Sequence, residues 1–274
     1  MNSFEGNTLL EGIISVKAAV EGKKRTVNKV YVDLDKRKQR DRKIMAFVSF
    51  LKTENVDFEF LPRVDIDEML KKHSGENAGN SHGGVIAFVS PRCFTGLEQM
   101  LEGAGIGDYF VCLDGIEDPY NLGYCIRTLY AMGASGFVLP QRNWEKVWSV
   151  VARASAGACE LCDIALSEND GKTADTIASS GLDIVCSALS KDSVPVQEFV
   201  PSKPFVLFVG GEKRGISAEF MEKAASIVHI PYARESVRYS LPAASVCAVY
   251  ASSLYPYACK KNVEVWKEQK CSDM

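Results

Sequence analysis

The sequence has no apolar run long enough to cross a lipid bilayer. A membrane-spanning helix needs about 18 or more consecutive apolar residues, and polar or charged residues interrupt every apolar stretch of the 274-residue chain before that length. The segment from Met1 to Gly6 lacks the charged region and apolar core of a signal peptide, and Glu5 and Glu11 disfavour an organelle transit peptide. The sequence therefore predicts no membrane partner.

The sequence also lacks the cysteine pattern of a disulfide framework or a zinc site. The number of cysteines is odd and most lie within apolar runs, which favours buried thiols in a reducing cytoplasm. Cys159 and Cys162 form one CxxC, with neither a second CxxC nor a suitably spaced histidine pair. We expect a cytoplasmic protein without a metal. The nine cysteines are at positions 93, 112, 125, 159, 162, 186, 247, 259 and 271.

A strongly basic overall charge is missing too, because the net charge is −3. Any surface for a nucleic acid must therefore be local. One such stretch exists: positions 23–43 hold ten lysines or arginines and three aspartates. It is either a solvated helix face or a set of phosphate contacts. The candidate phosphate ligands in it are Lys23, Lys24, Arg25, Lys36, Arg37 and Lys38.

The first part of the chain, residues 1–92, alternates strand-like and helix-like segments. Periodicity predicts strands at 30–34, 58–61 and 84–89, and helices at 36–51 and 66–72. This pattern is typical of a small α/β domain. Residues 93–108 read as a linker that contains a short helix at 96–102 and a glycine run at 103–107. That run follows a helix and lacks GxGxxG spacing, so it is not a dinucleotide site.

The second part, residues 109–274, predicts an α/β domain with a largely parallel sheet covered on both faces. Ligands of such sheets bind at the carboxyl ends of the strands. We expect strands at 109–113, 136–139, 182–187, 205–209 and 227–230, and a long closing helix at 242–257.

Three loops of this domain join a buried strand to a helix through glycine and polar residues. The first contains Asn121, a helix-capping residue type, and Arg127, which is either an exposed helical arginine or a ligand of a phosphate or hydroxyl. The second is Gly210-Gly211-Glu212, where a ligand can approach the backbone closely. The third runs from Ile230-Pro231 to Ser240-Leu241-Pro242, where Ser240 has helix capping as its alternative role.

In this order and spacing the three loops resemble the motifs of the SpoU/TrmH-type 2′-O-ribose RNA methyltransferases of the SPOUT superfamily. The family's first motif, Asn-x-Gly-x-x-x-Arg-Thr, is matched by residues 121–128, and Gly-x-Glu-x-x-Gly is matched by residues 210–215. The third, Ile-Pro followed by Ser-Leu-Asn-x-Ser, is matched by 230–231 and 240–245, except that proline stands at 242 and the second serine comes one position later, at 245. The matches span about 113–250, nearly the whole second domain.

The resemblance implies a domain with a trefoil knot that binds S-adenosylmethionine (SAM), acts on ribosomal or transfer RNA and forms a homodimer. It points to Gly210, Gly211, Ile230 and Leu241 as cofactor ligands. It gives catalytic or orienting roles to Asn121, Arg127, Glu212 and Ser240, with Arg127 facing the cofactor of the other subunit.

The family also implies that the first domain binds RNA and is of a ribosomal-protein type. Its usual closing segment, His-Gln-Gly-Val-x-Ala, is here residues 82–87 with glycine at 83, and His82 becomes a candidate RNA contact. Because Pro242 has no N–H to donate, Arg234 and Arg238 in the preceding loop are candidates to compensate for the missing asparagine.

Two alternatives of other classes stay open at this point. An RNA-binding protein of the same fold without catalytic activity is consistent with Pro242. The second alternative is a Rossmann-type NAD enzyme. It requires a glycine fingerprint on the first strand–helix turn, and the sequence has none there. The same lack disfavours the unrelated class of methyltransferases with a glycine-rich first loop.

Overall fold

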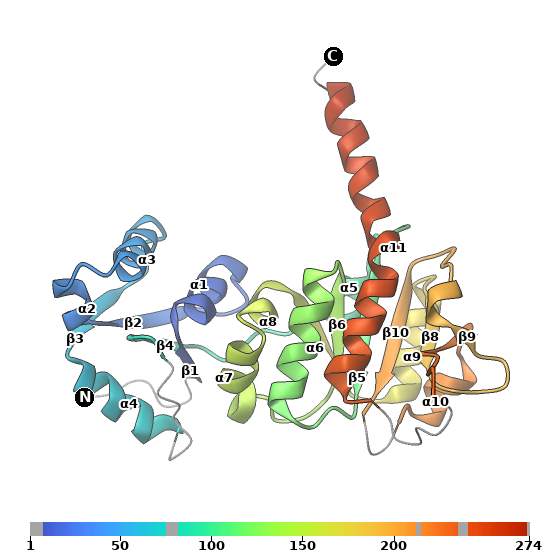
Figure 1. Cartoon of the computed structure of the whole chain (residues 1–274), viewed down its shortest axis with the longest axis horizontal. Helices are drawn as coiled ribbons and strands as arrows, with labels where there is room; N and C mark the ends of the chain where they lie inside the picture. Colours follow the sequence, from blue (N-terminus) through green and yellow to red (C-terminus); the bar gives the residue numbers. More distant parts are fainter. Residues whose placement is uncertain (1–7, 75–81, 212–214, 235–240, 273–274) are drawn as a thin grey trace. The chain divides into compact units, whose positions relative to one another are not determined.

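The computed structural model describes residues 8–74, 82–211, 215–234 and 241–272, and the chain divides into two compact units (Figure 1). Unit 1 comprises Met1–Cys93 and Asn143–Leu161, and unit 2 comprises Phe94–Arg142 and Cys162–Met274. The segment 143–161 lies inside the second domain by sequence, yet it packs within unit 1.

Unit 1 is built on a four-stranded sheet in the order β1-β4-β2-β3. Its strands are β1 (Thr8–Glu11), β2 (Val27–Asp33), β3 (Phe58–Leu61) and β4 (Val85–Val89). β4 is antiparallel to β1 and to β2, whereas β2 and β3 are parallel. All five residues of β4 are buried, as expected for a central strand with both faces covered.

The helices described in unit 1 are α1 (Ile13–Gly22), α2 (Leu34–Lys38), α3 (Arg42–Thr53), α4 (Arg63–Ser74), α7 (Glu145–Ala154) and α8 (Ala158–Leu161). The single helix predicted at 36–51 is two helices. Arg40 adopts a left-handed φ of 54°, which a helix interior does not tolerate. Asp33 and Asp41 then each cap a new helix start through their carboxylates.

Close backbone approach explains why α7 and α8 belong to unit 1. A Cβ on Gly22, the last residue of α1, would lie 1.9 Å from the Glu160 carbonyl oxygen. A Cβ on Gly157 would lie 2.5 Å from the Cβ of Ala18. An ion pair of 2.9 Å between Arg153 and Glu11 adds a contact to β1. Sequence periodicity cannot reveal the two glycine contacts, because each depends on a glycine that lets two separate chain segments approach closely.

Unit 2 contains a seven-stranded sheet in the order β7-β6-β5-β10-β8-β11-β9, and every neighbouring pair in it is parallel. Its strands are β5 (Tyr109–Asp114), β6 (Gly136–Pro140), β7 (Asp163–Ser167), β8 (Asp183–Ser187), β9 (Val194–Pro195), β10 (Phe205–Gly210) and β11 (Ser226–His229). This confirms the parallel α/β class, and it adds β7 and β9 to the five predicted strands.

Helices cover both faces of this sheet. A core that includes Phe110, Val206 and Phe208 packs against α5 (Leu97–Leu101), α9 (Asp170–Ser179) and α10 (Ala218–Glu222). On the other face α6 (Pro119–Ala131) packs against α11 (Ala243–Ser272), and the two helices lie side by side in Figure 1. Helix α11 continues past Pro256, beyond the predicted end at 257.

The strand order places β10 between β5 and β8, so chain segments distant in sequence become neighbours. The path that decides whether the chain is knotted includes residues 212–214 and 235–240, which lie outside the described residues, and the trefoil knot stays a prediction. Within the described ranges, no helix has the length and apolar character needed to cross a membrane.

Candidate active site

A pocket of about 410 Å³ opens at the carboxyl edge of the parallel sheet in unit 2. It lies between the loop after β5, the loop after β10 and the start of α11. This is the edge at which a parallel sheet is expected to bind its ligand. The lining residues are Gly115, Ile116, Glu117, Asp118, Pro119, Asn121, Gly211 and Ala243.

The amino terminus of α6 forms one side of the pocket. The Asp118 carboxylate accepts the backbone N–H of Asn121 at 2.8 Å and caps the helix, and Pro119 occupies the first turn, where its missing N–H costs nothing. Asn121 is half-buried and lines the pocket; its role toward a ligand stays a prediction.

Two backbone approaches fix the floor of the pocket. Gly115 has a left-handed φ of 72°, and a Cβ on Gly211 would lie 2.1 Å from the Gly115 carbonyl oxygen. A Cβ on Gly210 would lie 2.5 Å from the carbonyl carbon of Gly215. No side chain fits at either position, so Gly210 and Gly211 hold bare backbone beside the pocket.

Arg127 does not line this pocket. It lies six residues after Asn121 on α6, which is about 9 Å along a helix axis at 1.5 Å per residue, and its side chain is exposed. Tyr120 and Tyr124 share its face of α6 and are 45% and 46% exposed. Within one chain, Asn121 and Gly211 line the same pocket, and Arg127 does not.

The other predicted cofactor ligands flank the site. Ile230 directly follows β11, and Leu241 precedes α11 by two residues; both are half-buried, and neither lines the pocket. The Tyr250 hydroxyl on α11 donates to the Val228 carbonyl at 3.1 Å and ties α11 to β11. Burial raises the pKa of Tyr250 to about 12, so it keeps its proton as the donor.

The remaining residues of the third motif are partly described. Pro242 is exposed, and its carbonyl accepts the N–H groups of Ser245 and Val246 at 2.8 and 3.0 Å, which starts α11. Arg234 is exposed. The predictions for Glu212, Ser240 and Arg238 fall outside the described residues.

Arg142 is a residue that the sequence did not single out. It follows β6, and its Nη2 donates to the carbonyl of Glu117 in the pocket loop at 3.3 Å. Burial lowers the pKa of Arg142 and the Glu117 carboxylate raises it, but a guanidinium with an ordinary pKa above about 12 stays charged. Only its position two residues after a strand could have indicated it.

The candidate RNA contacts of unit 1 divide by exposure. Lys23, Arg37 and Lys38 are exposed, whereas Lys24 and Lys36 are half-buried, and Lys36 donates to the Gly83 carbonyl at 2.7 Å.

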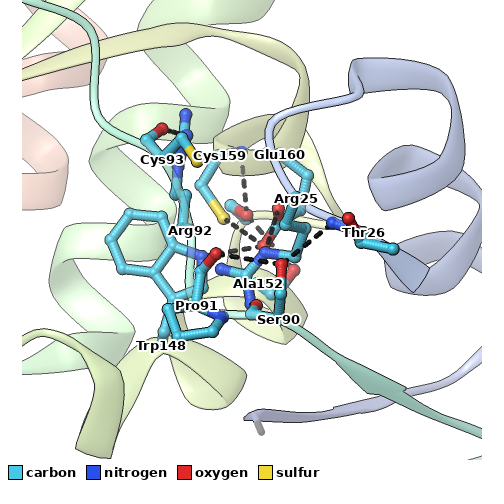
Figure 2. Close-up of polar contacts among 11 residues, drawn as sticks. Arg25, Thr26, Ser90, Pro91, Arg92, Cys93, Trp148, Ala152, Cys159 and Glu160 are labelled. Atoms are coloured by element: carbon cyan, nitrogen blue, oxygen red, sulfur yellow. Dashed lines mark hydrogen bonds and ion pairs between the residues drawn. The ribbon is translucent and has the colours of Figure 1, made fainter. Parts of the chain in front are cut away.

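Two of those candidates need correction, because their side chains are buried. The Arg25 side chain is 1% exposed and lies 3.0 Å from the Glu160 carboxylate, whose own side chain is 0% exposed (Figure 2). His82 is fully buried, and its Nε2 lies 2.9 Å from Asp67. Neither side chain is placed to touch RNA phosphates, so both are structural residues of unit 1.

Among the described residues, no group of three or more histidine, cysteine, aspartate or glutamate side chains is arranged to hold a metal ion.

The sheet order and the pocket at its carboxyl edge define a parallel α/β protein whose fold is shared by solved structures. The rRNA methyltransferase of Sinorhizobium meliloti aligns with 91% of this chain and 86% of its own length, at 21% identity and a TM-score of 0.70. The SpoU methyltransferase AviRb of Streptomyces viridochromogenes aligns with 94% and 91%, at 18% identity and a TM-score of 0.71. Both have also been solved with AdoMet bound.

The sequence comparison identifies the family. The SpoU rRNA Methylase family matches residues 108–250, which is more than half of the chain. An uncharacterized tRNA/rRNA methyltransferase of Mycolicibacterium paratuberculosis is 30% identical over 214 residues, 77% of this chain and 67% of its own. A TrmH family tRNA/rRNA methyltransferase of Bacillus subtilis, described as putative, is 28% identical over 68% of this chain and 72% of its own. The chain belongs to the SpoU rRNA methylase family.

Proposed function

We propose that this protein transfers a methyl group from SAM to a ribose 2′-hydroxyl of RNA, with ribosomal RNA as the first substrate to test. The observation that carries the proposal is that Asn121 and Gly211, from two of the three motif loops, line one pocket at the carboxyl edge of the sheet. A neighbour described as an RNA 2′-O ribose methyltransferase supports the fold, with a TM-score of 0.70 at 19% identity.

The pocket suits SAM because part of its lining is glycine backbone. At Gly211 a Cβ would collide with the Gly115 carbonyl of the facing loop, and exposed peptide groups can supply the hydrogen bonds that an adenine requires. Gly210, Gly211, Ile230 and Leu241 are the residues that we assign to the cofactor. When bound, SAM supplies an electrophilic methyl group.

Methyl transfer also requires that the ribose be positioned and that its 2′-hydroxyl lose its proton. Arginine is a poor base at its ordinary pKa, so we assign Arg127 to orienting the 2′-hydroxyl or a neighbouring phosphate. Asn121, Glu212 and Ser240 would orient Arg127 or the ribose. Holding the oxygen in line with the methyl carbon contributes several kcal/mol through proximity alone, within the roughly 7–11 kcal/mol available to well-oriented reactions.

The exposed position of Arg127 supports a homodimeric enzyme. It stands on the open face of α6 with Tyr120 and Tyr124, and large exposed aromatic side chains are enriched at protein interfaces. In a dimer that buries this face, Arg127 reaches the cofactor of the other subunit.

Transfer RNA is the alternative substrate, and Pro242 supports a second candidate function. An RNA-binding protein without catalytic activity is consistent with a proline in place of the family's asparagine, since proline has no N–H to donate.

The proposal is tested by following labelled methyl from SAM into unmodified ribosomal and transfer RNA. Wild type should label one RNA pool. Arg127→Ala should lose that activity while it still binds SAM, and Lys172→Ala, an exposed cation on α9 away from the pocket, should behave as wild type. If the wild type does not bind SAM, the proposed methyltransferase activity is wrong. SAM binding without transfer to either RNA supports the inactive alternative.

A further inference from the structure

Unit 1 has a groove of about 820 Å³ whose floor is apolar and whose rim is charged. Helices α1 and α3 supply most of the floor. Ile14 at the start of α1 is 63% exposed, although a large aliphatic side chain is normally covered. The apolar lining residues include Ile13, Ile14, Ala46, Phe47, Phe50 and Ala156.

An aromatic pair forms part of the floor. The rings of Phe47 and Phe50 have centroids 6.3 Å apart and planes 21° apart. Phe47 is buried, whereas Phe50 is half-buried. The Lys17 ammonium lies 5.1 Å from the centroid of Phe50. Lys17 is an exposed side chain with a second partner, Glu21, at 3.5 Å, so it can leave the ring at little cost.

The rim carries a positive excess. Four cations, Lys17, Lys36, Lys43 and Arg153, stand with two carboxylates, Glu11 and Asp41, among the lining residues. The carboxylates are already engaged. Glu11 pairs with Arg153 at 2.9 Å, and the Asp41 side chain accepts the N–H groups of Lys43 and Ile44 at 2.9 and 3.1 Å. The charge left to meet a ligand is positive.

We propose that this groove binds an unpaired nucleotide of the RNA substrate, with the base stacked on Phe50 and the flanking phosphates on Lys17 and Lys43. An aromatic platform beside lysines fits a splayed base and its backbone. A stacked duplex presents no free base face, so the groove selects single-stranded RNA. The inference deepens the proposed function, because it names the part of the RNA that unit 1 takes.

The first test compares a labelled twelve-nucleotide oligouridine with a twelve-base-pair RNA duplex in fluorescence anisotropy with the full chain. Phe50→Leu keeps apolar bulk and removes the ring. It should weaken oligouridine binding about tenfold, which is about 1.4 kcal/mol, and change duplex binding less than twofold. Met45→Ala is the matched control, since Met45 is 46% exposed on the same helix and does not line the groove.

The second test measures salt dependence for the phosphate contacts. Lys17→Gln and Lys43→Gln should each lower the slope of log affinity against log salt by about 0.7, the value for one phosphate contact on a single strand. Lys52→Gln, an exposed lysine of α3 outside the groove, should leave the slope unchanged. A midpoint temperature of thermal unfolding equal to that of the wild type establishes that Phe50→Leu is folded.

Three results overturn the groove assignment: oligouridine binding that Phe50→Leu leaves intact, an equal loss for oligouridine and duplex, or concentration-dependent self-association that Phe50→Leu abolishes. The last would make a second copy of this chain the occupant. If Phe50→Leu weakens oligouridine binding as expected, but the wild type binds SAM and transfers no methyl group, the proposed function is wrong and the groove assignment stands. Normal methyl transfer with unaltered oligouridine binding in Phe50→Leu would defeat the groove alone.

Discussion

The buried ion pair between Arg25 and Glu160 holds α8 against the segment that precedes β2, and replacing Arg25 with methionine measures its contribution. Arg25 Nε lies 3.0 Å from Glu160 Oε2, without the alignment of a hydrogen bond. Trp148 Nε1 donates to the other carboxylate oxygen at 2.7 Å, and Arg25 Nη1 donates to the Ser90 carbonyl at 3.2 Å (Figure 2). Desolvation by burial lowers the pKa of Arg25, while the Glu160 carboxylate raises it.

Two opposing quantities decide the size of the effect. At 3.0 Å and an effective dielectric of about 20, the attraction is about 5.5 kcal/mol, and desolvation of both charges offsets much of it. Arg25→Met removes the attraction and leaves the buried Glu160 carboxyl group without its cation, which costs about 3–5 kcal/mol. The double variant Arg25→Met with Glu160→Gln removes both charges and keeps an acceptor for Trp148, so it should be less destabilised than Arg25→Met alone.

Hydrogen exchange read by mass spectrometry locates the change, because regions open with their own free energies. Peptides covering β2, β4 and residues 143–161 should exchange more than about a hundredfold faster in Arg25→Met, since 1.4 kcal/mol corresponds to tenfold. Peptides covering β5 and β10 should not change.

The matched control is Lys29→Met, because Lys29 pairs with the exposed Asp57 at 3.0 Å and an exposed pair is worth about 0–1 kcal/mol. Unchanged exchange in residues 143–161 of Arg25→Met, or a loss no larger than that of Lys29→Met, would refute the reasoning.

Three further outcomes follow from unit 2. Gly211→Ala should abolish SAM binding, seen by calorimetry, because its Cβ would lie 2.1 Å from a carbonyl oxygen of the facing loop. Burial raises the pKa of Asp108, but hydrogen bonds from Lys261 and Ser135 outweigh it and leave the pKa below its usual value. The stability that Asp108 contributes is therefore fully present above the pKa of its carboxyl group in the unfolded chain. It is lost as the pH falls through the lower pKa of this group in the folded protein. Asp108→Asn should flatten the wild-type loss of stability below about pH 4, as acid titration of unfolding would show. Pro242→Asn should raise the methyl-transfer rate about fivefold with unchanged SAM affinity, if the amide restores one hydrogen bond worth about 1 kcal/mol.

The parallel sheet could be predicted because its strands are short, apolar and separated by helical periodicity. Strands at 109–114, 136–140 and 205–210 lie within one residue of the predicted positions. Their residues are almost all buried, and near-continuous apolar runs of this kind are the strongest signal of a doubly covered sheet. The two-residue strand β9 has no such signal, since a length of two carries no periodicity.

The long-range contacts could not be predicted, because they depend on which segments meet. Arg25 stands in a basic stretch and reads as a surface cation, yet its partner Glu160 lies 135 positions further along the chain. His82 likewise reads as a substrate contact from the family pattern, but Asp67 and the Gly84 N–H surround it in the fold. The strand–loop–helix pattern singles out Gly211 and Asn121 separately, and only the resemblance links their loops into one site.

The position of the methyl group on the RNA product tests the central claim most directly. RNA methylated by the wild type with labelled SAM would be digested to nucleosides, and the glycosidic bond of the labelled nucleoside would be cleaved before mass spectrometry. The added mass should stay with the ribose, the linkage should resist alkaline cleavage, and both signals should vanish in Arg127→Ala. Label that leaves with the base, or transfer that survives in Arg127→Ala, would contradict the central claim.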